Sequence, residues 1–410
     1  MTPTATTQRS TEQATDKTAI RPFHVSVPET ELTELRRRIN ATKWPERETV
    51  SDATQGVQLA TMQALARYWA TDYGWRKVEA RLNAYPQFIT EIDGLDIHFI
   101  HVRSKHKNAL PLIVTHGWPG SVVEQLKIID PLTNPTAHGG RAEDAFDVVI
   151  PSMPGYGFSG KPTATGWNPA HIASAWVMLM KRLGYNKFVA QGGDWGAVIT
   201  ELMGVQAPPE LLGIHTNMPG IFPTEIDQAA ASGKPAPSGL SAEEKVAYEA
   251  LQLEYQKGIA YGYQMGLRPQ TLYGIADSPV GVAAYFLDHD AASYALIARV
   301  FAGGNEGLTR DDVLDNITIA WLTNTFISGA RLYWEYWGKG GYFNVKGVSI
   351  PVAVSVFPDE LYPMPRSWAE RAFPKLIHFN KLPKGGHFAA FEQPKLFSEE
   401  LRAGFSSLRR

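Results

Sequence analysis

Apolar residues recur along the first part of the chain with two different periods. In the stretches 28–40, 55–70 and 75–83 they lie three or four positions apart, which predicts amphipathic helices. In the stretch 89–103 they alternate instead, on either side of an Asp-Gly pair at 93–94 that is typical of a tight hairpin turn. The chain is therefore predicted to open with helices and to continue into a β-hairpin.

Short apolar runs follow, and each ends in a loop rich in glycine or proline. Helical stretches at 170–183 and 197–205 lie between several of these runs, and such alternation predicts a mostly parallel sheet. The predicted strands of this part are 111–115, 146–150, 187–191 and 211–216.

The alternation stops from about residue 221 to residue 325, where helices, one of them at 241–257, and loops follow one another without strand-like runs. Predicted strands return at 350–357 and 375–380. A helical insertion in an α/β sheet predicts a cap over the carboxyl edge of the strands, where open α/β folds bind ligands. The predicted class is α/β, with a mostly parallel sheet, an inserted helical cap and an N-terminal helical extension.

These patterns divide the chain into predicted segments. The first is assigned as a tail because its residues are polar, rich in threonine and without periodicity. The segments are a flexible tail at 1–20, an N-terminal region at 21–88, a first part of the core at 89–220, the helical cap at 221–325 and a second part of the core at 326–410.

The composition excludes several classes of function. The 410 residues carry a formal net charge of −2, so no basic field gathers phosphates and we expect no nucleic-acid partner. The absence of cysteine rules out disulfides and thiolate metal sites and suits a reducing cytosol. The sequence has neither a signal peptide nor the apolar run of about 20 residues that a membrane span needs. We therefore expect a cytoplasmic protein without a membrane anchor, and a homodimer is compatible with these properties.

The sharpest local feature is the sequence Gly-Gly-Asp-Trp-Gly at 192–196, between a predicted strand and a predicted helix. A nucleophile elbow needs small residues two positions before and after the nucleophile, because its turn is tight. Gly192 and Gly196 meet that need, so Asp194 would be exposed as a nucleophile with the N–H of Trp195 beside it as an oxyanion donor. From these residues alone, an Asp194 that only caps the following helix is equally compatible.

The motif His-Gly-Trp-Pro-Gly at 116–120 follows the predicted strand 111–115. A fold with this elbow has its second oxyanion donor at that place, and the N–H of Trp118 is the candidate. His116, in the same motif, is expected to have a structural role rather than a catalytic one.

A carboxylate and a base are expected after the last predicted strands, because nucleophile, acid and histidine occur in that order along such a chain. Asp359 and Glu360 follow the strand 350–357, and either could orient the base. His387 follows the strand 375–380 and is the candidate base.

A further polar cluster, Asp288-His289-Asp290, suggests a metal site at first sight. However, neither HExxH nor another recognised ligand spacing accompanies it. We therefore expect the reaction to use no metal and no organic cofactor.

Several longer motifs are spread over nearly the whole chain after residue 20. They are Arg-Pro-Phe at 21–23, Tyr-Pro-Gln-Phe at 85–88, His-Gly-Trp-Pro at 116–119, Pro-Gly-Tyr-Gly-Phe-Ser at 154–159, Gly-Gly-Asp-Trp-Gly at 192–196, Asp-Ser-Pro-Val-Gly at 277–281 and Gly-His-Phe-Ala-Ala at 386–390. Together they resemble the microsomal-type epoxide hydrolases, in particular the soluble microbial branch. The resemblance implies an α/β-hydrolase fold preceded by an N-terminal epoxide hydrolase region.

The resemblance also implies roles for further residues. The family places its acid at the fourth position of Phe-Pro-x-Asp/Glu, which is Glu360 here. It uses two tyrosines on the cap side, which correspond to Tyr261, counted back from Pro269, and to Tyr333 in Arg-Leu-Tyr-Trp-Glu. Tyr263 is the alternative to Tyr261. The two tyrosines and the two oxyanion tryptophans would bind the substrate.

The activity implied is conversion of a hydrophobic epoxide and water to a vicinal diol. Asp194 would attack the epoxide carbon and form an ester, while the two phenols donate to the epoxide oxygen. His387, oriented by Glu360, would then activate water against the ester. Two alternatives remain. A haloalkane dehalogenase shares the Asp nucleophile but releases a halide that needs no proton, and a non-catalytic protein could use the same scaffold for binding.

Overall fold

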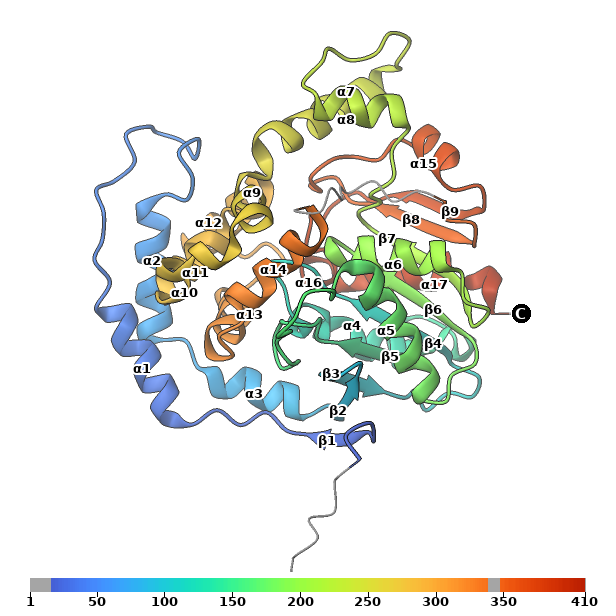
Figure 1. The fold of residues 1–410 in the computed structure, drawn as a ribbon, viewed down its shortest axis with the longest axis horizontal. Helices are drawn as coiled ribbons and strands as arrows, with labels where there is room; N and C mark the ends of the chain where they lie inside the picture. Colours follow the sequence, from blue (N-terminus) through green and yellow to red (C-terminus); the bar gives the residue numbers. More distant parts are fainter. Residues whose placement is uncertain (1–15, 338–346, 410) are drawn as a thin grey trace, which may run out of the picture.

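The computed structural model describes residues 16–337 and 347–409. Within these residues, nine strands form one sheet in the order β1-β2-β3-β5-β4-β6-β7-β8-β9 (Figure 1). The strands from β4 to β9 pair in parallel, whereas β1, β2 and β3 pair antiparallel at one edge. The mostly parallel sheet predicted from the sequence is therefore confirmed. The strand bounds are β1 (Arg21–Phe23), β2 (Gln87–Ile92), β3 (Leu95–Val102), β4 (Leu110–Thr115), β5 (Phe146–Pro151), β6 (Phe188–Gly192), β7 (Leu211–Thr216), β8 (Val352–Val356) and β9 (Leu376–Lys381).

The central strands are covered on both faces. Every residue of β6 and β8 is buried, which explains why these strands appear in the sequence as continuous apolar runs. Helices α5 (Pro169–Arg182) and α6 (Trp195–Gln206) pack together on one face, and α4 (Leu126–Thr133) and α17 (Pro394–Gly404) pack together on the other (Figure 1). Because parallel strands end along the same edge, the loops after β4, β6, β7, β8 and β9 meet there.

Between β7 and β8, the described chain is helical, as the sequence predicts, and its helices lie beside the sheet (yellow-green to orange in Figure 1). The boundary of the cap at residue 325 remains a prediction, and α14 beyond it packs against α9. No helix among the described residues combines the length and the apolar character needed to cross a membrane. The helices of this part are α7 (Thr224–Ala231), α8 (Ala242–Leu253), α9 (Ala260–Leu267), α10 (Tyr273–Ala276), α11 (Pro279–Leu287), α12 (Ala291–Phe301), α13 (Arg310–Leu322) and α14 (Phe326–Tyr336).

The N-terminal helices pack against this inserted region. Helices α1 and α2 contact α11, α2 also contacts α12, and α3 contacts α13. The Gln58 N–H donates to the Tyr294 hydroxyl at 2.9 Å, and the Arg38 guanidinium donates to the Asp277 carboxylate at 2.7 Å. The N-terminal extension therefore braces the helical insertion. Its helices are α1 (Glu29–Asn40), α2 (Leu59–Thr71) and α3 (Trp75–Asn83), and α15 (Arg366–Ala372) and α16 (Ala389–Glu392) complete the C-terminal part.

Local details differ from the predictions. Helix α2 begins at Leu59 instead of residue 55, because Gly56 has a φ of 98°, outside the helical region. Strand β1 was not predicted, because three residues are too short to show a period and are held by pairing with β2. The helix predicted over 241–257 ends at Leu253 and continues as the π-helical turn Glu254–Gly258. Of the predicted tail, residues 1–15 lie outside the described residues, and 16–20 are exposed.

The contact between α3 and α13 yields a stability prediction. The buried Asp315 carboxylate accepts from the Tyr73 hydroxyl at 2.8 Å and from the Arg81 guanidinium at 2.7 Å. Asp315→Ala removes both acceptors and leaves the buried Tyr73 hydroxyl without this partner. We expect the free energy of unfolding to fall by about 1–3 kcal/mol, measured by chemical denaturation. Glu249→Ala, at an exposed position of α8, is the control, and an equal loss in both variants would contradict a bracing role for Asp315.

Candidate active site

Asp194 lies in the turn between β6 and α6, at the carboxyl edge of the sheet. Its backbone has φ 53° and ψ −129°, a conformation that non-glycine residues seldom adopt and that fits a strained strand-to-helix elbow. The side chain makes no capping hydrogen bond to α6. Instead, its Oδ1 accepts a 2.6 Å hydrogen bond from the N–H of Trp118. The alternative that Asp194 only caps the helix is therefore wrong.

Glycines around the elbow are required by close backbone approach. A Cβ on Gly192 would lie 1.9 Å from the carbonyl oxygen of Gly196, and a Cβ on Gly196 would lie 2.1 Å from that of Thr115. A Cβ on Gly117 would lie 2.2 Å from Oδ1 of Asp194. The two loops that hold the carboxylate can therefore meet only because these positions have no side chain.

The loop after β4 directs the N–H of Trp118, the predicted second oxyanion donor, to the carboxylate of Asp194. Trp195 begins α6, and the N–H groups of a first helical turn point out along the helix axis. His116 is buried, and its Nε2 accepts from the N–H of Met153 at 3.2 Å. Burial lowers the pKa of His116 to about 4, so it is a neutral ring that holds two loops together. This geometry agrees with the structural role expected for it.

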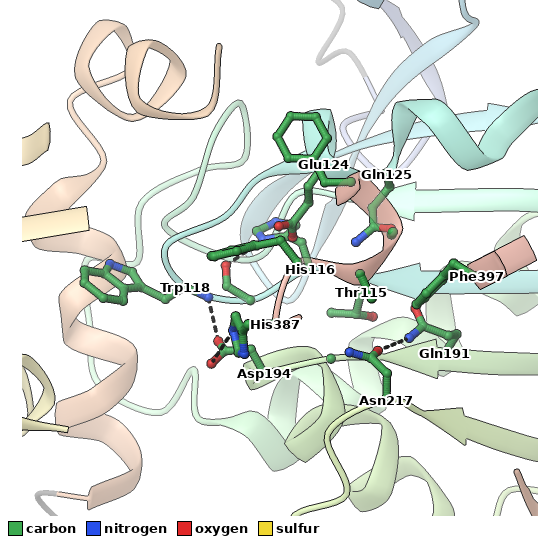
Figure 2. A pocket seen from close by; sticks show the side chains of 16 residues that line it. Thr115, His116, Trp118, Glu124, Gln125, Gln191, Asp194, Asn217, His387 and Phe397 are labelled. Atoms are coloured by element: carbon green, nitrogen blue, oxygen red, sulfur yellow. Dashed lines mark hydrogen bonds and ion pairs between the residues drawn. The ribbon is translucent and has the colours of Figure 1, made fainter. Parts of the chain in front are cut away.

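His387 and Glu360 form a buried pair beside Asp194 (Figure 2 shows His387 and Asp194). The His387 Nδ1–H donates to Glu360 Oε1 at 2.6 Å, and the opposite nitrogen, Nε2, lies 3.6 Å from Asp194 Oδ2. Asp359 is exposed, so Glu360 is the carboxylate that reaches the ring. Burial lowers the pKa of His387, but the charges of Glu360 and Asp194 outweigh burial and raise it to about 10.

Tyr261 on α9 and Tyr333 on α14 lie across the site from the elbow. The Tyr261 ring stacks on Trp118 at a centroid distance of 4.7 Å, and the Tyr333 ring meets Trp195 edge-on at 4.7 Å. Both are buried, and burial raises the pKa of both phenols well above the ordinary value, so they remain protonated donors. Tyr263 is 51% exposed, and its hydroxyl donates to a backbone carbonyl. The structure thus brings Tyr261, and not Tyr263, to the site.

His289 belongs to the site although the sequence did not assign it there. It lies in the loop between α11 and α12, is 1% exposed, and places Nε2 3.8 Å from Asp194 Oδ2. Its Nδ1 pairs with Asp290 at 2.9 Å, and its ring lies 4.3 Å from that of His387. One ligand atom each from Asp194, His289 and His387 falls within 4.8 Å, a spacing that could also accept a metal ion. The sequence feature that could have pointed to His289 is the polar triplet 288–290, which directly follows the almost wholly apolar helix α11.

A cavity beside Asp194 is lined by side chains from the loops after β4, β6 and β9, among them Trp118 and His387 (Figure 2). Glu124, which the sequence did not single out, lines this cavity together with Gln125, Asn217 and His387. Burial raises the pKa of Glu124 to about 8. Polar side chains therefore line part of this cavity together with His387.

Comparison with known proteins places these features in a family. The signature described as the epoxide hydrolase N terminus matches residues 20–125, and the one described as the alpha/beta hydrolase fold matches residues 111–261. The α/β-hydrolase fold predicted from the sequence is thereby confirmed.

The relatives match over almost their full length. A protein of Stigmatella aurantiaca (strain DW4/3-1) named "Putative epoxide hydrolase" is 50% identical over 398 residues, which are 95% of this chain and 86% of that protein. Epoxide hydrolase 1 of Oryctolagus cuniculus is 35% identical over 93% of this chain and 88% of its own length. The crystal structure of juvenile hormone epoxide hydrolase from the silkworm Bombyx mori matches with a TM-score of 0.83 and 29% identity, covering 97% of this chain and 96% of that one.

The glycine geometry predicts a severe effect of one methyl group. In Gly196→Ala the added Cβ must displace the β4 loop that carries Trp118, because it would lie 2.1 Å from a backbone oxygen. A shift of about 1 Å at a reacting group can cost roughly 100-fold in rate, so we expect at least that loss in steady-state turnover. Gly274→Ala is the control, since a Cβ there meets no atom within 4 Å. Equal activity of the two variants would contradict the tight elbow.

Proposed function

The chain belongs to the microsomal-type epoxide hydrolases, and we propose that it hydrolyses epoxides through a covalent ester on Asp194. This proposal rests on the different surroundings of the two oxygens of the Asp194 carboxylate. Oδ1 is held by the N–H of Trp118 at 2.6 Å, whereas Oδ2 faces the imidazole of His387 at 3.6 Å. One oxygen is thus in place as the future oxyanion, and the other is directed to the reacting centre.

In the first step Asp194 Oδ2 attacks one epoxide carbon, and the C–O bond of the strained ring breaks. A carboxylate can do this at neutral pH without a base, because it is already charged. The departing oxygen is a strong base as it forms and needs a proton. Tyr261 and Tyr333 donate hydrogen bonds to that oxygen, and one of them protonates it. Their phenols suit an oxygen leaving group, which favours an epoxide over the haloalkane considered above.

In the second step His387 takes a proton from water, and the hydroxide attacks Cγ of the ester. The oxyanion on Oδ1 is stabilised by the N–H groups of Trp118 and Trp195. Ester formation itself prepares the base. The negative charge of Asp194 helps to raise the pKa of His387, so neutralising that charge lowers the pKa and frees the imidazole to accept a proton. Glu360 keeps Nε2 directed at the water by holding Nδ1.

We further propose that the helical insertion acts as a cap that binds the hydrophobic part of the epoxide. It supplies Tyr261 on α9, and residues of the same helix also line a pocket whose walls are largely apolar, with Phe222, Leu251 and Leu267 among them. A hydrophobic substituent placed there gains about 25 cal/mol for each Å² of apolar surface removed from water. We also propose that the protein is located in the cytoplasm.

Replacing the base should stop the reaction at the ester. In His387→Gln the epoxide still alkylates Asp194, but water is not activated, so we expect turnover to fall by about 10²–10⁴-fold. Mass spectrometry of the quenched enzyme should show the mass of one epoxide on the peptide that contains Asp194. The exposed His24→Gln serves as the control and should show no adduct. If His387→Gln carries no adduct while remaining folded, the ester mechanism is wrong.

Removing the phenol hydroxyls should slow ring opening only. We expect Tyr261→Phe and Tyr333→Phe each to lower the rate of ester formation in a single turnover, within the range of about 10²–10⁴-fold typical of general acids. Tyr263→Phe removes the same atom from an exposed ring and should keep the wild-type rate. A rate loss in Tyr263→Phe alone would transfer the role to that residue.

A further inference from the structure

His289 is a buried imidazole at the nucleophile that the mechanism so far leaves without a task. Its Nε2 faces Asp194 Oδ2 at 3.8 Å and has no hydrogen-bond partner among the described residues. Its other nitrogen is held by Asp290 at 2.9 Å. A buried polar atom without a hydrogen-bond partner costs folding free energy. Because Nε2 of His289 is directed at an oxygen that reacts, its partner is expected to form during the reaction.

That partner follows from the proposed ester. When the ester is hydrolysed, the bond between Cγ and Oδ2 breaks, and Oδ2 departs as an oxygen of the diol. An alkoxide is a poor leaving group unless it receives a proton as the bond breaks. The pKa of His387 is raised to about 10 in the resting site, so the proton that it takes from water restores its own resting charge, and a second group supplies the proton for Oδ2. We propose that His289 is the general acid of ester hydrolysis and protonates Oδ2 of Asp194 as the diol leaves.

The protons balance over the cycle. One proton moves from water to His387 Nε2, the hydroxide oxygen bonds to Cγ, and one proton moves from His289 Nε2 to the departing Oδ2. The regenerated Asp194 carboxyl group retains the second proton of water, which passes to the adjacent His289. Before these steps, His387 has given its resting proton to the phenolate left by ring opening, so the proton that it takes from water restores its resting charge. Every group ends in its starting state, with epoxide and water converted to diol.

The surroundings of His289 keep it protonated between turnovers. Burial and the neighbouring His387 lower its pKa, but the carboxylates of Asp194 and Asp290 outweigh them and leave the pKa raised. The titratable groups that face it come from different elements: Asp194 after β6, His387 after β9, Asp290 on its own loop, Tyr261 on α9 and Glu254 in the π-helical turn. The ring is thus a cation beside an anion in the resting site and an acid once the ester has formed.

The experiment compares wild type with His289→Gln in single turnovers, with ester formation and ester decay measured separately by rapid quench. A series of epoxides is used whose diols differ in the acidity of the departing hydroxyl. We expect ester decay to slow by about 10²–10⁴-fold and ester formation to change little. Decay in the variant should depend steeply on the acidity of the departing hydroxyl, whereas the wild type should show a shallow dependence. At high pH, wild-type ester decay should slow as His289 loses its proton, and the variant should lack this loss.

Two further variants test whether the charge of His289 controls ester decay. Asp290→Asn leaves the ring but removes one of the charges that raise its pKa, so the alkaline loss of decay rate should shift to lower pH. Asp288→Asn changes an adjacent exposed carboxylate and should decay like the wild type. All assays contain EDTA, and a wild-type enzyme inactivated by EDTA would point to a bound metal and overturn the proposal.

If ester decay in His289→Gln is slow but depends on the acidity of the departing hydroxyl as in the wild type, His289 has only a structural role. That result would also overturn the proposal. Ester decay at the wild-type rate would do the same while leaving the ester mechanism intact. Absence of any ester in His387→Gln would instead remove the proposed function on which this role rests. The two failures are therefore distinguishable.

Discussion

The site depends on one hydrogen bond, from the N–H of Trp118 to Oδ1 of Asp194 at 2.6 Å. It joins the loop after β4 to the elbow after β6, two neighbouring strands whose carboxyl ends lie side by side. The bond can form only because Gly196 lets the two backbones meet, Gly117 leaves room for the side chain of Asp194, and Asp194 adopts a positive φ. Holding one carboxylate oxygen in this way leaves the other to face the imidazoles, so the chemistry of the site follows from the geometry of the turn.

Around that carboxylate the protein has buried several charges together. Asp194, Glu360 and Asp290 contribute carboxylates, and His387 and His289 contribute the imidazoles between them. Buried charges are tolerated when each has a partner, and here each ring is paired on one nitrogen with its own carboxylate. In the mechanism that we propose, alkylation of Asp194 removes one negative charge from this set, and both imidazoles then become weaker bases. Under this proposal, the step that opens the ring also changes the protonation of the groups that we assign to hydrolysis.

The sequence predicted the parts of the site that rest on local patterns. Asp194 and His387 follow strand signals directly, and parallel strands bring their ends to one edge. The choice of Glu360 over Asp359 and of Tyr261 over Tyr263 could not come from such patterns, since it depends on which side chain of a neighbouring pair faces inwards; family resemblance supplied it. His289 escaped prediction, because its distance to Asp194 is set by how α11 and α12 pack and not by any spacing in the chain.

The N-terminal extension contributes to that packing. Helices α1 and α2 lie against α11 and α12, and hydrogen bonds from Arg38 to Asp277 and from Gln58 to Tyr294 join the two regions at both ends of the segment that carries His289. The loop between α11 and α12 is thus fixed from outside the cap, while Asp194 is fixed by the sheet. Since an acid must lie within hydrogen-bond reach of the oxygen it protonates, the extension determines whether the two can meet. In the mechanism that we propose, a region far from Asp194 in sequence thereby contributes to the catalytic geometry.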